Sequence, residues 1–210
     1  MLRFAVFLTC LIFVFPAQTN AQVTRPDALV EFRAGNFERA VQICLDEIAE
    51  NPNNLESHVV ITWSLIALNR YDEALRFARA GRAISRYDVR ITQVLGEIAF
   101  FQGRNIEALR YFQEYINLAP EGPRIQLVYY FVGEIYIRLG MFRHADIALS
   151  TAVHRVPNNA MWWSRLGYAR ENAGDLLAAI TAYERALAIN SQLTDARRGL
   201  DRSRQALAGR

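Results

Sequence analysis

A recurring interval of 34 residues constrains this chain more than any other feature. Gly35, Asn69 and Gly103 lie 34 residues apart, and Gly140 and Gly174 continue the series after one interval of 37 and another of 34. Five residues further on, alanine recurs with the same intervals, at Ala40, Ala74, Ala108, Ala145 and Ala179. A fixed period of this length indicates a repeated supersecondary unit that buries its apolar face against its neighbours.

Two further columns of residues indicate how each unit is built. They are Gly96, Gly133 and Gly167, and Pro52, Pro120 and Pro157. A glycine midway along a helix lets a second helix approach closely, and a proline after the second helix ends it. The Gly35 column is expected to end the first helix in a left-handed turn. Each unit is therefore predicted to be a helix, a tight turn and a second helix.

This pattern resembles that of the tetratricopeptide repeat family. The matching residues are clearest in the last unit: Trp163, Leu166, Gly167, Gly174, Ala179, Tyr183 and Ala186. The resemblance implies an all-α fold, a right-handed α-solenoid of five tetratricopeptide-like helix-turn-helix repeats plus a C-terminal capping helix. By register the repeats are residues 22–54, 55–88, 89–122, 126–159 and 160–193, and the capping helix is residues 194–210.

Three places in the array need separate predictions. Pro26 lies inside the first helix expected of the first unit, so that helix is predicted to begin there, with proline in its first turn. The second unit has Thr62 and Arg86 in the glycine and proline columns. In the last segment, an apolar stripe on one helical face is predicted to cover the open end of the stack. The stripe consists of Leu193, Ala196, Leu200 and Leu207.

The N-terminal residues predict export. Arg3 precedes an apolar block over residues 4–15, and small residues before Ala21 supply a cleavage site, so residues 1–21 are expected to be a signal peptide cleaved after Ala21. The block is shorter than the ~20 residues that a membrane-spanning helix needs. The alternative is an uncleaved segment that anchors the chain at the membrane. We expect a periplasmic or envelope-associated protein.

Composition argues against several classes of function. The chain has 24 basic and 21 acidic residues, and every basic residue is arginine, so no lysine can form a Schiff base or bind phosphate in a phosphate loop. The balanced charge argues against nucleic-acid binding. Cys44 is expected to pack in the core, and the three histidines show no metal-ligand or catalytic spacing. We therefore expect no enzyme, no cofactor and no metal site.

The resemblance also implies where a partner would bind. In this family the first helices line a concave surface, and ligands meet the second, fifth, ninth and twelfth places of each unit. In this sequence these groove residues include Leu29, Phe32, Val59, Trp63, Ile66, Arg90, Glu97, Phe100, Tyr130, Glu134, Ile137, Tyr168 and Glu171. Alternatively, several of these aromatic rings pack between neighbouring first helices. The ninth places hold neither lysine nor asparagine, which argues against a clamp for acidic chaperone tails.

A basic stripe is the strongest local charge feature. Its arginines recur at spacings of three and four, which aligns them on one face of a second helix. They are Arg76, Arg79, Arg82 and Arg86. The stripe is interpreted either as a convex patch for anionic lipid, polysaccharide or an acidic partner, or as a solvated face partly paired with Asp72, Glu73 and Asp88.

Two functions follow from these observations. In the first, the chain is a non-enzymatic scaffold or adaptor of the bacterial cell envelope that binds a peptide or helix of another protein in its concave groove. In the second, it is a structural subunit of an envelope machine for pilus, outer-membrane, polysaccharide-export or flagellar motor assembly, and uses its convex face and ends. Nucleic acid is not an expected partner, and contact with a membrane is expected only through the signal peptide or a partner.

Overall fold

The computed structural model of the chain describes residues 26–209. These residues form helices and no strands, so the fold class is the all-α one that the sequence predicts. The helices are α1 (Ala28–Arg33), α2 (Phe37–Glu50), α3 (Leu55–Ala67), α4 (Tyr71–Ile84), α5 (Val89–Phe101), α6 (Asn105–Leu118), α7 (Ile125–Arg138), α8 (Phe142–Arg155), α9 (Ala160–Ala173), α10 (Leu176–Ile189) and α11 (Thr194–Ala208).

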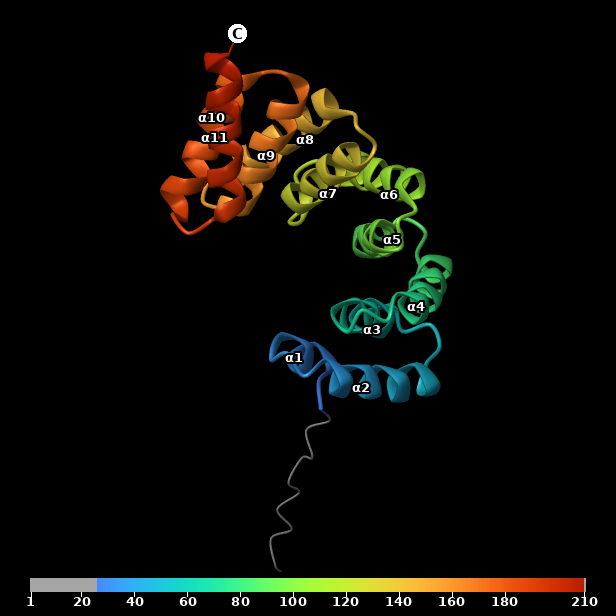
Figure 1. Ribbon diagram of the computed structural model, residues 1–210. Helices are drawn as coiled ribbons and strands as arrows, with labels where there is room; N and C mark the ends of the chain where they lie inside the picture. The colour runs from blue at the N-terminus through green and yellow to red at the C-terminus, as the bar shows by residue number, and fades with distance from the viewer. Residues whose placement is uncertain (1–25, 210) are drawn as a thin grey trace, which may run out of the picture.

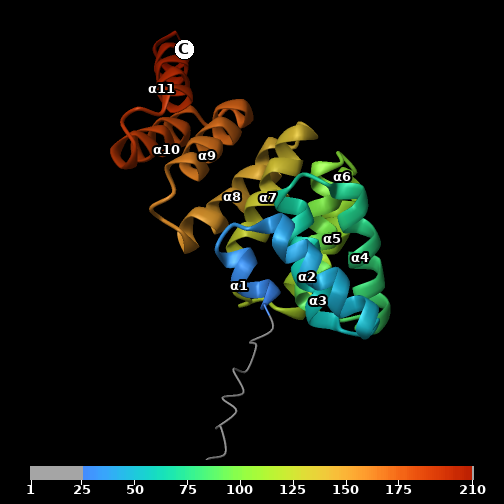
Figure 2. The same ribbon diagram turned by 90° about the horizontal axis from the view of Figure 1, so that it is seen from below.

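The helices form antiparallel pairs that stack along a curved path (Figure 1). The first helices of successive pairs, α1, α3, α5, α7 and α9, contact one another in turn. Figure 1 shows α3 and α5 toward the inside of the curve and α4 and α6 on its outside. Figure 1 shows α9, α10 and α11 at the opposite end of the stack from α1, and the view from below in Figure 2 shows them displaced to one side of α1 to α6. This arrangement is an α-solenoid, as predicted.

The turn inside each pair uses the left-handed conformation predicted for it. The residues that end the first helices have φ angles of 82° at Gly35, 59° at Asn69, 73° at Gly103, 71° at Gly140 and 86° at Gly174. Asparagine is the residue other than glycine that adopts this conformation most readily, which explains its place in the second unit.

The mid-helix glycines allow close contact within a pair, as predicted. A Cβ atom at Gly96 would lie 2.5 Å from a ring carbon of Phe112, and one at Gly133 would lie 2.5 Å from Cγ of Leu149. In the second unit the same two positions hold Thr62 and Ala78, both fully buried. The larger residue on the first helix there is matched by a smaller one on the second, which conserves the volume between the two helices.

The first helix begins later than the sequence predicts. Pro26 precedes the helix instead of lying in its first turn, because Asp27 is the N-terminal cap. The carboxylate of Asp27 accepts hydrogen bonds from the backbone N–H groups of Leu29 and Val30. As a result α1 has only six residues.

The last helix packs on the end of the array. Ala196 is fully buried and Leu200 is 7% exposed, whereas Leu207 is 37% exposed and lies beyond the covered surface. Gly199 faces the ring of Tyr183, so α11 lies close to α10.

The predicted signal peptide, residues 1–21, lies outside the described residues. Within residues 26–209, no helix combines the length and the apolar composition needed to cross a bilayer. Cys44 is fully buried, as predicted, and burial raises the pKa of its thiol to about 12.

Candidate functional site: an inner groove

A hollow of about 410 Å³ lies across the first three helix pairs. Helices α1, α3 and α5 supply most of its wall, and the turn before α7 contributes Pro123 and Arg124. We call this hollow the inner groove. Its residues are Leu29, Phe32, Arg33, Trp63, Ile66, Ala67, Val89, Arg90, Gln93, Glu97, Tyr115, Pro123 and Arg124.

Aromatic and aliphatic side chains form the apolar wall of the inner groove. The ring centroids of Phe32 and Trp63 lie 5.7 Å apart, so the two rings form one surface shared by α1 and α3. Phe32, Trp63 and Ile66 are half-buried and pack against the core behind them. Rings held in this way can bury large apolar area on binding with little further loss of freedom.

Two polar side chains from α5 lie on this otherwise apolar surface. Gln93 is 2% exposed and Glu97 is 6% exposed. The Nε2 group of Gln93 donates a hydrogen bond to Oε1 of Glu97 over 2.6 Å. Nη2 of Arg124 lies 3.8 Å from the same oxygen. Burial raises the pKa of Glu97 above its usual value, and the contributions of Gln93 and Arg124 offset this only in part.

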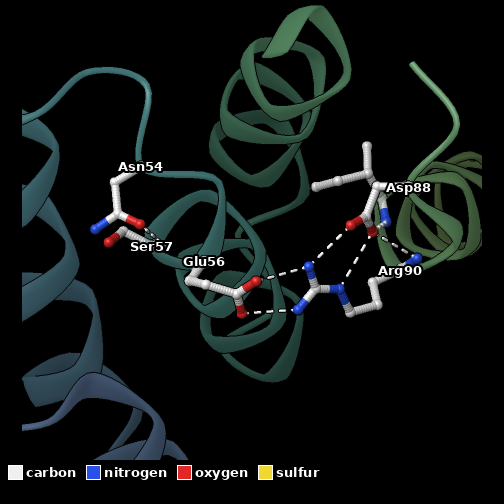
Figure 3. Close-up of polar contacts among 6 residues, drawn as sticks. Asn54, Glu56, Ser57, Asp88 and Arg90 are labelled. Atoms are coloured by element: carbon white, nitrogen blue, oxygen red, sulfur yellow. Dashed lines mark hydrogen bonds and ion pairs between the residues drawn. The ribbon is translucent and has the colours of Figure 1, made fainter. Parts of the chain in front are cut away.

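Arg90 connects α3 to the start of α5 at the rim of the inner groove. Its guanidinium donates to the two carboxylate oxygens of Glu56 over 2.7 and 2.8 Å, and to Oδ2 of Asp88 over 2.8 Å (Figure 3). Burial alone would raise the pKa of Asp88, but hydrogen bonds from Arg90 and from the backbone N–H of Ile91 lower it below the usual value. The guanidinium of Arg90 is therefore already bound in a contact between the second and third repeats.

The local sequence explains why Arg90 forms this contact with Glu56 and Asp88. Asp88 is the N-terminal cap of α5, and its Oδ1 accepts from the backbone N–H groups of Arg90 and Ile91. Asn54 caps α3 in the same way by accepting from the backbone N–H of Ser57 (Figure 3). Because Glu56 and Arg90 each stand two residues beyond a cap, stacking the two helices brings their side chains together.

The inner groove brings together six members of the predicted set, and two others, Val59 and Phe100, are buried in the core instead. It contains Leu29, Phe32, Trp63, Ile66, Arg90 and Glu97. Val59 is fully buried, so its prediction as a groove residue is wrong. Phe100 is also wrong as an accessible ring. It is 6% exposed, its ring centroid lies 4.7 Å from that of Phe131, and the guanidinium carbon of Arg138 lies 3.7 Å above it.

The remaining predicted residues lie outside the inner groove, in the second half of the array. The ring of Tyr130 stacks on Trp162 at a centroid distance of 5.0 Å, and burial raises the pKa of Tyr130 to about 12. Glu134 accepts two hydrogen bonds from Arg165 over 2.6 and 2.9 Å. Ile137 packs beside the core of α8 and α9. Phe100 and Tyr130 therefore pack between neighbouring first helices, which is the alternative that the sequence leaves open.

Tyr168 lines a separate hollow near the C-terminus, and Glu171 is bound to two other side chains that line it. This hollow, of about 270 Å³, includes Tyr168 and Tyr183. Glu171 accepts hydrogen bonds from Arg202 over 2.7 and 2.9 Å and from the hydroxyl of Tyr183 over 2.6 Å. These bonds join α9 to α10 and α11.

Sequence reasoning missed Gln93 and Arg124. Gln93 occupies the fifth place of the third unit, which is one of the groove places, so the register itself identifies it although the residues named from the sequence do not include it. Arg124 follows Gly122 and Pro123, in the interval that is three residues longer than the others. That insertion places the turn before α7 at the end of the inner groove, which a strict 34-residue register does not anticipate.

The predicted basic stripe is only partly free. Arg82 donates to both carboxylate oxygens of Glu114 over 2.8 and 2.9 Å, which joins α4 to α6. Arg76 lies 3.8 Å from Glu73, whereas Arg79 is exposed. The guanidinium carbon of Arg86 lies 5.9 Å from the ring centre of Tyr87. The stripe therefore combines solvated arginines with one that holds two repeats together.

Within residues 26–209, no three histidine, cysteine or acidic side chains gather to hold a metal ion. Gln93 is hydrogen-bonded to Glu97, and Arg90 is hydrogen-bonded to Glu56 and Asp88 at the rim. The arrangement is suited to recognising a ligand by an apolar wall and a few oriented polar groups.

Comparisons with known proteins agree with this architecture. Residues 133–194 match the family model for the tetratricopeptide repeat. No curated protein matches the chain. Among solved structures, PilW, described as a widely conserved type IV pilus biogenesis factor, is 17% identical with a TM-score of 0.71, over 87% of this chain and 89% of PilW.

Two other structures are similar. MamA from Desulfovibrio magneticus RS-1 is 16% identical with a TM-score of 0.69, over 79% of this chain and 92% of MamA. YrrB, described as a TPR protein with an unusual peptide-binding site, is 15% identical with a TM-score of 0.65, over 80% of this chain and 86% of YrrB. At these identities the likeness shows the fold alone. The family match shows tetratricopeptide repeats at residues 133–194, and these structures show that the described helix pairs have the fold of known tetratricopeptide repeat structures.

Proposed function

We propose that the chain is a non-enzymatic adaptor of the bacterial cell envelope that binds a peptide or helical segment of another protein in the inner groove. One observation carries the proposal. Phe32, Trp63 and Ile66 form an apolar wall in an open hollow of about 410 Å³, where they are accessible to a partner. The hollow has the size of small-ligand and peptide subsites, and most of its wall is apolar.

The similar structures support the class of function. A tetratricopeptide fold is typical of protein-interaction scaffolds, and the description of YrrB includes a peptide-binding site. The description of PilW as a pilus biogenesis factor supports a place in envelope assembly. The convex basic stripe gives less support to the structural-subunit alternative, because Arg82 is already bound to Glu114.

A crosslinked pull-down from envelope extract tests the adaptor function. Trp63→Ala should abolish partner capture, because it removes the largest side chain in the wall of the inner groove. Trp163→Ala is the matched control, since Trp163 is also half-buried but does not line the inner groove. Circular dichroism must show both variants folded. Equal capture by Trp63→Ala and wild type would end the groove proposal, and loss of capture in Arg79→Glu instead would favour the structural subunit.

Export belongs to the same proposal and rests on the sequence of residues 1–21. Fusion of residues 1–25 to alkaline phosphatase, which is active only outside the cytoplasm, should give active enzyme in a bacterial host. Replacing Leu11 and Phe13 by arginine in the fusion should abolish that activity, because the apolar block would be interrupted. Inactive wild-type fusion would contradict export.

A further inference from the structure

We propose that Glu97 and Gln93 form a subsite for one basic side chain, arginine or lysine, of the segment that binds in the inner groove. This inference rests on the proposed function and specifies the chemistry of the partner. The subsite lies on the α5 side of the groove, and Phe32 of α1 and Trp63 of α3 line the same hollow. The partner would therefore be an apolar segment with a basic residue among its anchors.

The carboxylate of Glu97 lacks a close cation of its own. Its one ion pair among residues 26–209 is to Arg124, at 3.8 Å, which is too long for a hydrogen bond. The side chain of Arg124 is 53% exposed, while that of Glu97 is 8% exposed. Water screens the charge of Arg124 far more than that of Glu97. A buried carboxylate without a close cation favours binding of a ligand cation that loses its water on entering the groove.

A comparison with Glu134, at the equivalent position of the next unit, shows what Glu97 lacks. Glu134 stands at the ninth place of the fourth unit, as Glu97 does in the third, and Arg165 from the next unit binds it over 2.6 and 2.9 Å. The position of the fourth unit equivalent to Arg165 is Phe131, which is 8% exposed and cannot neutralise Glu97. Among residues 26–209, Glu97 therefore faces the groove without the arginine that Glu134 receives from the following unit.

The other charged groups around the inner groove repel a basic side chain only weakly. The guanidinium of Arg90 is bound by Glu56 and Asp88, so this cluster of three groups carries one net negative charge. Arg33 is exposed, and its charge is screened by solvent. The aromatic side chains of Phe32, Trp63 and Tyr115 line the same hollow. Aromatic faces attract arginine and lysine cations, so they complement the carboxylate.

A peptide selection tests the subsite. A random heptapeptide library displayed on phage is selected on immobilised protein and, in parallel, on the Glu97→Gln variant. Wild type should enrich peptides that share a basic residue between apolar residues, and the variant should lose that preference. Enrichment of peptides without a shared basic position, or the same preference in Glu97→Gln, would overturn the subsite but leave the adaptor function intact. If wild type enriches no peptide, the proposed function itself fails.

Fluorescence anisotropy of one selected peptide then measures the coupling. Replacing its basic residue by glutamine should weaken binding to wild type by about 30-fold, the effect of removing one partner of a buried charge pair. The same replacement should have little further effect on binding to Glu97→Gln. Glu114→Gln is the control, because that carboxylate pairs with Arg82 away from the groove and its loss should leave binding unchanged. Equal losses in wild type and Glu97→Gln would refute the pairing.

Discussion

Gly96 tests whether the glycine column exists for close packing of the two helices in a repeat. A Cβ at this position would lie 2.5 Å from Cε1 and 2.7 Å from Cδ1 of Phe112. The shorter distance is 0.9 Å below the 3.4 Å at which ordinary contacts begin. The ring cannot move aside freely, because Phe112 is fully buried and stacks on Phe131 with centroids 5.6 Å apart. Gly96→Ala therefore forces α5 and α6 apart or displaces the ring.

The expected net effect is a loss of stability. Overpacking of this kind costs about 1–3 kcal/mol. The higher helix propensity of alanine recovers roughly 1 kcal/mol. Because the clash is with a fully buried ring, the upper half of the overpacking range applies, so Gly96→Ala should lower the free energy of unfolding by about 1–2 kcal/mol. In a Phe112→Ala background the clash is absent, so the same substitution should instead stabilise by up to about 1 kcal/mol.

Urea unfolding of wild type, both single variants and the double variant measures this change of sign. Circular dichroism reports the helices, and tryptophan fluorescence reports both sides of the substitution, because Trp63 lies in the second unit and Trp162 and Trp163 lie in the fifth. Two probes are needed because repeat arrays can unfold in parts. A Gly96→Ala protein as stable as wild type, or additive effects in the double variant, would refute the packing argument.

Three further predictions address the turn, the buried carboxylate and the thiol. Gly174→Asn should change the melting temperature little, because Asn69 adopts the same left-handed turn. Gly174→Val should lose about 1–2 kcal/mol of stability. Equal melting temperatures of these two variants would contradict the prediction. Burial raises the pKa of Glu97, so the folded state binds its proton more tightly than the unfolded state, and stability is lost as pH rises from the unfolded pKa through the folded one. Glu97→Gln should therefore raise the melting temperature at pH ~7 by more than at pH ~4, and a lower melting temperature at neutral pH would exclude an uncompensated carboxylate. The buried Cys44 thiol, with its pKa raised to about 12, should react with iodoacetamide only as fast as the surrounding helices open, as followed by mass spectrometry of its peptide; rapid labelling of the folded protein would show that the thiol is accessible.

The two patterns that define the repeat could be predicted because each acts on a single position. A left-handed turn selects glycine or asparagine at Gly35 and its equivalents through backbone sterics alone. A close contact between paired helices selects glycine at Gly96 for a similar reason. Such requirements recur every 34 residues, so they remain readable even in the second unit, where Thr62 and Ala78 exchange large and small side chains.

The start of the first helix was predicted less well, because two local signals compete there. Pro26 favours a first helical turn, but Asp27 caps the helix one residue later and shifts its start to Ala28. The choice between them depends on which hydrogen bonds the folded chain makes.

Only the tertiary structure decided which side chains at the groove positions are accessible. Val59 and Trp63 stand one helical turn apart and both belong to groove places, yet one is fully buried and the other lines the hollow. Position in the repeat does not decide this, because exposure depends on side chains of the neighbouring units. The pairing of Glu134 with Arg165 and the lack of such a partner at Glu97 likewise depend on residues about 30 positions away. The period of the array is thus a property of the sequence, and the chemistry of its groove is a property of how the units meet.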